Sequence, residues 1–208
     1  MAEFNSYLLG KARKSVGNIT LCYTRSKNIA KAKVFTRKDN PTPEILAQRA
    51  RMKVLVQLSR SLLPVIRKGF VGIGKGPTSN AFVASNQKAV TVDEKNVATV
   101  DFEKLLVATG LVNPPKVTVM YDEESKKYQF TQEVQEEEDG YASAEDKVYG
   151  VLYETERDRS RLVMLRARGE SGSTSYALPE DWDSTKVKVY CFAMLKNGKG
   201  ASDSVLIS

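Results

Sequence analysis

The side chains with the clearest chemical potential in this sequence are lysines and arginines, which can bind phosphate or carboxylate groups. Residues 1–90 contain 17 Lys and Arg against 3 Asp and Glu, whereas residues 91–208 contain 15 against 22. Such a division predicts a basic part that meets a polyanion or an acidic partner, and an acidic part that could itself be one. The candidate contact residues are Arg25, Lys27, Lys31, Lys33, Arg37, Lys38, Arg49, Lys53 and Arg60.

Catalysis and metal binding are poor expectations, because the chain contains no histidine. Histidine is the commonest general base, the usual partner of a nucleophilic Ser or Cys, and a frequent zinc ligand. The acidic run 136–140 lacks the alternating ligands of a calcium loop and is expected to be a solvated loop. Cys22 and Cys191 lie in apolar, strand-like segments, which favours buried free thiols over a disulfide. We therefore expect a non-enzymatic protein with no catalytic residues, cofactor or metal.

A glycine-rich segment, 69–76, is the only candidate for a phosphate-binding loop. Gly69 to Lys75 satisfies the G-x-x-x-x-G-K spacing of such loops. Gly76 stands where a hydroxyl should hold Mg²⁺, and a helix rather than a strand is expected before the segment. The segment is therefore better interpreted as a flexible connection between helices.

The first basic residues lie on a predicted β-hairpin. Residues 17–24 are rich in β-branched and aromatic side chains, and residues 29–35 alternate between apolar side chains and Lys or Ala. A turn is expected at Ser26-Lys27-Asn28. The alternation places Lys31 and Lys33 on one face of the return strand.

A helix is expected from Pro43 to about Leu63, with Thr42 as its N-cap and Glu44 in its first turn. Its apolar face is formed by Met52, Val54, Leu55, Leu58 and Leu62. The opposite side of the helix carries a basic stripe, which is either a track for phosphates or a solvated face. Pro64 is expected to kink or restart the helix. A second short helix is expected from Thr78 or Ser79 to Val90. The basic stripe consists of Arg49, Lys53, Arg60 and Arg67.

The chain changes in character near residue 97, which predicts a basic hairpin-plus-helices region at 1–96 and a β-sandwich at 97–208. The fold class is therefore α+β, with two helices and an antiparallel sandwich of the immunoglobulin or fibronectin type III kind. The sandwich strands are expected at 116–121, 128–131, 148–154, 162–167, 174–178, 186–195 and 202–207.

Several short motifs are spread over nearly the whole chain. They are 15–18 (SVGN), 40–44 (NPTPE), 46–52 (LAQRARM), 79–82 (SNAF) with Asn86, 189–190 (VY), 197–199 (NGK) and 202–205 (SDSV). Together they resemble a domain-of-unknown-function family of gut anaerobes and their tailed phages. That resemblance implies a virion component, with no established activity to transfer. The acidic loop 133–146 is longer and more charged than the family pattern.

Taken together, these observations favour a non-enzymatic phage structural protein, a ring or adaptor subunit of the connector or tail. Oppositely charged halves suit head-to-tail contacts between copies and with neighbouring virion proteins. The first alternative is sequence-independent nucleic-acid binding through the hairpin and first helix, including contact with packaged DNA. The second is a host-encoded module that recognises a protein or a glycan. We expect no signal peptide and no membrane span, and location in the virion after synthesis in the bacterial cytoplasm.

Overall fold

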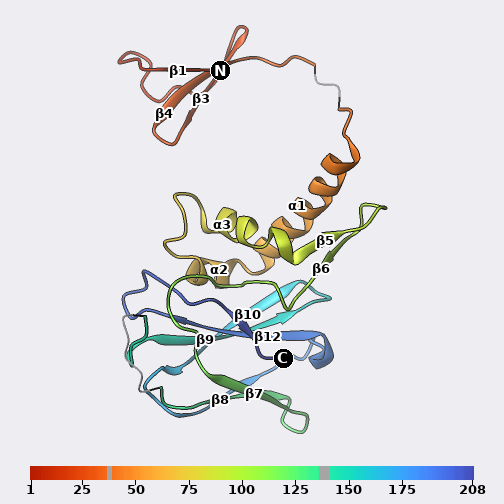
Figure 1. Cartoon of the computed structure of the whole chain (residues 1–208), viewed down its shortest axis with the longest axis vertical. Coiled ribbons are helices and arrows are strands. Elements are labelled where there is room, and N and C mark those ends of the chain that lie inside the picture. The colour runs from red at the N-terminus through yellow and green to blue at the C-terminus, as the bar shows by residue number, and fades with distance from the viewer. Residues whose placement is uncertain (37–38, 136–140) are drawn as a thin grey trace. The chain divides into compact units, whose positions relative to one another are not determined.

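The structure is a computed structural model that describes residues 1–36, 39–135 and 141–208 (Figure 1). The chain is mixed α+β and divides into two compact units, Met1–Pro41 and Thr42–Ser208, called below the N-terminal and C-terminal units. The domain boundary expected near residue 97 lies inside the C-terminal unit. As a boundary between separate domains it stays a prediction.

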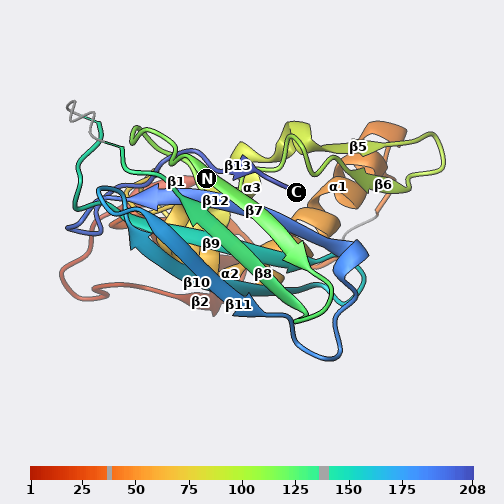
Figure 2. The same ribbon diagram turned by 90° about the horizontal axis from the view of Figure 1, so that it is seen from below.

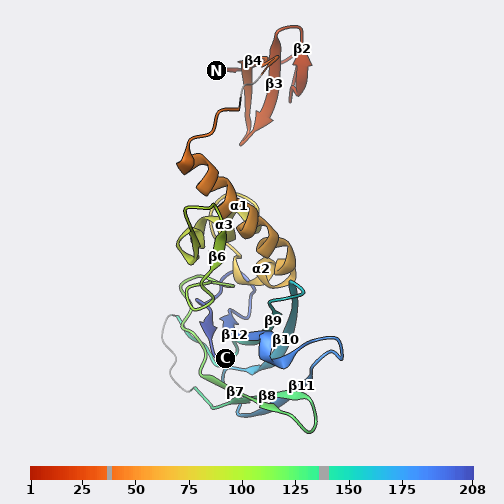
Figure 3. The same cartoon turned by 90° about the vertical axis from the view of Figure 1, so that its right-hand side faces the viewer.

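The N-terminal unit is a four-stranded antiparallel sheet with the order β1-β4-β3-β2 (Figure 3). The expected hairpin, β3 and β4, forms its centre, and two strands that were not predicted flank it. Each of the flanking strands is three residues long, too short to show alternation in the sequence. The strands are β1 (Ala2–Phe4), β2 (Lys14–Val16), β3 (Ile19–Thr24) and β4 (Lys27–Ala32).

The hairpin turn lies earlier than expected. Thr24 already pairs with Lys27, so the turn consists of two residues, Arg25 and Ser26, with φ of 49° and 64°. Positive φ at both positions is the geometry that matches the twist of a two-residue hairpin. Asn28, expected in the turn, is instead buried in β4, where its side chain bonds to the backbone of Gly10 and Ala12.

Three α-helices follow, one more than expected. The predicted first helix is interrupted at Leu62, and Pro64, which has no N–H to donate, is the second residue of the next helix. Thr42 occupies the predicted N-cap position, but its side chain makes no capping bond. The side chain of Thr42 instead bonds to Glu44 and lowers the pKa of that carboxyl. The helices are α1 (Pro43–Ser61), α2 (Leu63–Gly69) and α3 (Thr78–Ser85).

The seven strands expected in the C-terminal part all form. They make a four-stranded antiparallel sheet, β10-β9-β12-β13, and a three-stranded one, β11-β8-β7, while β5 and β6 form a separate hairpin beside the helices (Figure 2). Short 3₁₀ turns occupy Gln87–Ala89 and Ser184–Lys186. The strands are β5 (Val90–Val92), β6 (Ala98–Val100), β7 (Val117–Asp122), β8 (Lys127–Gln132), β9 (Lys147–Glu154), β10 (Arg159–Ala167), β11 (Gly172–Ala177), β12 (Val187–Met194) and β13 (Val205–Leu206).

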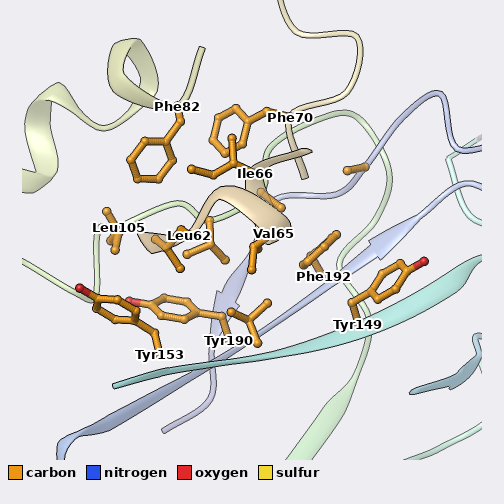
Figure 4. Close-up of a cluster of buried hydrophobic side chains, with 14 of the residues drawn as sticks. Leu62, Val65, Ile66, Phe70, Phe82, Leu105, Tyr149, Tyr153, Tyr190 and Phe192 are labelled. Atoms are coloured by element: carbon orange, nitrogen blue, oxygen red, sulfur yellow. The ribbon is translucent and has the colours of Figure 1, made fainter. Parts of the chain in front are cut away.

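The four-stranded sheet is covered on both faces, which makes the C-terminal unit three-layered. One face packs against the three-stranded sheet in a core that includes Phe130, Leu152 and Trp182. The other face packs against the helices, where Phe70 and Phe82 lie over Tyr190 and its neighbours (Figure 4). Strands β9 and β12 are therefore buried along nearly their whole length, which explains why their sequences read as continuous apolar runs.

Both cysteines are free, as expected; Cys191 is buried and Cys22 is half-buried. No helix in the described part of the chain is long and apolar enough to cross a membrane.

Candidate functional site

The N-terminal sheet presents one polar face that contains several of the predicted contact residues. Cross-strand partners share a face of a sheet, so the pairs Thr24–Lys27 and Thr20–Lys31 lie on the same side. Lys27 forms an ion pair with Glu3 at 3.0 Å and is thereby neutralised. Arg25 lies in the turn and lines a shallow hollow together with Glu3 and Lys27. Lys31 is exposed, with no ion pair in the described residues.

The basic surface continues beyond the end of β4. The backbone N–H of Lys33 donates to the carbonyl oxygen of Asn18 at 2.8 Å, so strand pairing extends one residue further. Lys33 thus keeps the side of Lys31, and its ammonium lies 5.2 Å from the ring centre of Phe35. Arg37 and Lys38, the next predicted contacts, lie outside the described residues.

The predicted basic stripe of the C-terminal unit lies on the exposed side of α1 and α2. Lys53, Arg60 and Arg67 are exposed and form no ion pair or hydrogen bond in the described part of the chain. Arg49 is also exposed and has an interaction of its own. The apolar side of α1 is confirmed, because Leu55 and Leu58 are buried. The break at Leu62 does not remove Arg67 from the exposed surface.

The boundary between the two units sharpens the charge division seen in the sequence. The N-terminal unit has 9 Lys and Arg against 2 Asp and Glu, a net charge of +7. The C-terminal unit has 23 of each and no net charge. Within it, residues 42–90 carry +7 and residues 91–208 carry −7. Each unit therefore contains a basic group of residues, and the acidic excess belongs to residues 91–208. The acidic run 136–139, which contributes four of these charges, lies outside the described residues.

The opposite face of the N-terminal sheet is apolar, and the sequence analysis did not single it out. Ile19 pairs with Val16 and with Ala32, and Leu21 pairs with Ala30, so these five side chains share one face. Val16 and Ile19 are 70% and 49% exposed. The signal was the alternation in residues 19–24, where apolar side chains take every second position with a polar or small one between them.

The described part of the structure contains neither a metal-binding cluster nor a glycine-rich loop between a strand and a helix. No cluster of three or more His, Cys, Asp or Glu side chains there is placed to hold a metal ion. The glycine-rich segment connects α2 to α3, as expected, and its first glycine has a packing role. A Cβ on Gly69 would lie 2.6 Å from the Cβ of Ala108, so the close approach of two segments requires glycine. What this protein presents is therefore charged and apolar surface.

Comparison with known proteins supports the resemblance seen in the motifs. No curated protein and no solved structure matches the chain. A family model described as a family of unknown function, DUF6266, matches residues 11–208. The match spans the helices, all the sheets of the C-terminal unit and three strands of the N-terminal sheet. The chain therefore belongs to DUF6266, a family of unknown function.

Proposed function

We propose that the protein is a non-enzymatic structural subunit of a phage particle, a ring or adaptor subunit of the connector or tail. In this proposal, copies assemble through surfaces of opposite charge, and neighbouring virion proteins are the other partners. The observation that carries it is the set of Lys53, Arg60 and Arg67 on α1 and α2, which have no partner among the described residues, opposed by the net charge of −7 on residues 91–208.

The cations of residues 91–208 differ from those on α1 and α2 in that several of them form ion pairs within their own part of the chain. In the described part of residues 91–208, ion pairs form between neighbours, such as Lys104 with Asp101 and Lys196 with Glu145. Lys53, Arg60 and Arg67 have no such neighbours in the part of the chain that the structure describes. Unpaired cations that face the acidic surface of another copy would favour association through Coulomb energy that is strongly screened by salt.

The fold of the C-terminal sheets suits a spacer or docking module. We interpret the two sheets as a fibronectin type III-like sandwich, because a three-stranded sheet of order β11-β8-β7 packs against a four-stranded sheet of order β10-β9-β12-β13. Modules of this kind bind or space partners and are seldom catalytic, although the fold alone does not name a function. The same module in a host-encoded protein would suit protein or glycan recognition, and the neighbouring genes distinguish the two settings.

The test combines particles with the purified protein. Imaging and mass spectrometry of purified virions should find the protein, and its absence from mature particles would refute the proposal. In solution, association should weaken from low salt to about 1 M salt, where charges are screened beyond about 3 Å. Lys53→Glu with Arg60→Glu should abolish the salt-sensitive association. The matched control, Lys116→Glu with Lys186→Glu, makes the same charge change on exposed residues outside the stripe.

Sequence-independent nucleic-acid binding is the second candidate, and the same unpaired cations support it. Arg25, Lys31 and Lys33 provide a second cationic surface on the N-terminal sheet. Affinity for duplex or single-stranded DNA should fall by roughly 0.9 log unit per log unit of salt for each phosphate neutralised. A fluorescence-anisotropy titration at low salt tests this, and the absence of binding to either form would eliminate the candidate.

A further inference from the structure

The N-terminal sheet is almost without a core. In the described part of the N-terminal unit, only Ala12 and Asn28 are buried. A sheet of three or more strands needs a covered hydrophobic face to be stable, and in this unit the apolar face of Val16, Ile19, Leu21, Ala30 and Ala32 is a surface.

The usual stabilisers of very small units are missing from its described residues. Units of about 40 residues generally depend on a disulfide, a metal or association with another chain. Cys22 is unpaired, and no metal-binding cluster occurs in the described residues. Association is the remaining means by which this sheet gains a second layer.

A second copy of the same face fits the apolar surface better than the other surfaces available. The exposed face of the three-stranded sheet, the obvious alternative in the C-terminal unit, bears mainly Thr, Ser and Gln side chains, with Met120 as its one large apolar residue. Nucleic acid would contact the cationic face instead. On the apolar face, by contrast, Lys14 is the one charged residue among the strand positions. The ammonium of Lys11, from the loop between β1 and β2, lies on the same face, 5.3 Å from the ring centre of Tyr23.

We propose that the apolar faces of two N-terminal sheets pack against each other about a two-fold axis, forming a two-layered sandwich between copies. Such a contact is self-complementary, as in the commonest class of homodimer. It buries the apolar faces and leaves the Lys27 and Lys31 side of each sheet directed outward, so few charges lose water.

The size of the face sets the strength of the contact. Two strands of six residues and two of three, about 4.8 Å apart, cover roughly 300 Å², well under half of the 800 Å² per partner in a standard interface. The loop between β1 and β2 adds exposed apolar side chains, with Tyr7 and Leu8 almost fully exposed. The dimer is therefore reversible and depends on protein concentration.

This contact differs in kind from the charge-driven assembly proposed above, and salt separates the two. Apolar burial persists or strengthens in high salt, whereas attraction between charges is screened. The same experiment can therefore detect association through the apolar faces even if the charge-driven association is absent, and the reverse.

The experiment is sedimentation velocity of the full chain over a wide range of protein concentration, in low salt and in about 1 M NaCl. The wild type should associate in high salt, and Ile19→Glu should weaken the dimer by about tenfold or more, because a charge is then buried in the interface. Thr24→Glu is the matched control, with the same charge change on the same strand but on the polar face.

Circular dichroism distinguishes a lost interface from a lost fold. Ile19→Glu should keep the far-ultraviolet spectrum of the wild type while its dimer dissociates at a protein concentration about tenfold higher, which an unfolded sheet would not show. A wild type that stays monomeric at every concentration in high salt would overturn the proposal. Equal association of Ile19→Glu and Thr24→Glu would overturn it too. So would docking of the apolar face onto the C-terminal unit of the same chain, since the sedimentation coefficient would then not depend on protein concentration.

Discussion

Replacing Arg168 with methionine should destabilise the C-terminal unit far more than removing the charge of an exposed arginine. Arg168 follows β10, and its side chain is 3% exposed. Its Nε lies 3.3 Å from Oδ2 of Asp146, whose side chain is 1% exposed, an ion pair that falls short of hydrogen-bond geometry. The guanidinium also donates to the carbonyl oxygen of Asn113 and to Oε1 of Gln135. It thus joins three segments of the C-terminal unit.

The expected loss follows from what remains after the substitution. Methionine fills similar space, but the carboxylate of Asp146 stays buried, and among the described residues only the backbone N–H of Ser143 still donates to it, at 3.0 Å. Removing one partner of a buried ion pair typically costs about 3–5 kcal/mol. With a urea dependence of about 2 kcal/mol per molar, the unfolding midpoint should fall by roughly 2 M.

Urea unfolding followed by the fluorescence of Trp182, the one tryptophan of the chain, reports on this unit directly, because Trp182 lies in the core between the sheets. Arg166→Met is the control, since Arg166 is an exposed arginine at the end of β10, two residues before Arg168. The double variant Arg168→Met with Asp146→Asn should lose less stability than Arg168→Met alone. If Arg168→Met lowers the midpoint no further than the control does, the buried pair does not stabilise the unit.

Three further predictions concern Gly150 and the two cysteines. A Cβ on Gly150 would lie 2.8 Å from Cε1 of Phe130, so Gly150→Ala should cost about 1–3 kcal/mol in urea unfolding, and Phe130→Leu should restore part of that loss. Burial raises the pKa of the Cys191 thiol to about 12 from 9.0. Because the unfolded chain loses that proton first, stability should fall from about pH 9 to about pH 12, and Cys191→Ala should flatten the fall. Ellman's reagent should modify the half-buried Cys22 in the folded protein and Cys191 only after denaturation; equal rates would contradict this.

The sequence predicted the elements that carry their own periodic signal. The start of α1 followed from Thr42 and Pro43, and its buried side from the spacing of Leu55 and Leu58. Strands β7 and β8 were clear because apolar and polar residues alternate in them.

The features that depend on distant packing were not predicted. β1 pairs with β4, 24 to 28 residues later in the chain, and its three residues contain no pattern of their own. The helices cover a sheet formed mostly by residues beyond 147, so their shared core emerges only from the fold. Of the candidate contacts, Lys27 proved to be paired with Glu3, which composition alone could not indicate. The apolar face required the register of β2, β3 and β4, which local sequence does not specify.

The shared core between helices and sheet has an electrical consequence. Because Phe70 and Phe82 fix the helix layer on the sheet that contains Tyr190, the +7 of residues 42–90 and the −7 of residues 91–208 belong to one body. The C-terminal unit therefore has no net charge but, because its basic and acidic residues belong to different parts of it, it has a permanent dipole moment. Each whole copy still carries the +7 of its N-terminal unit, so two copies repel at long range, while the dipoles of their C-terminal units favour approach with unlike ends together. Salt screens both effects.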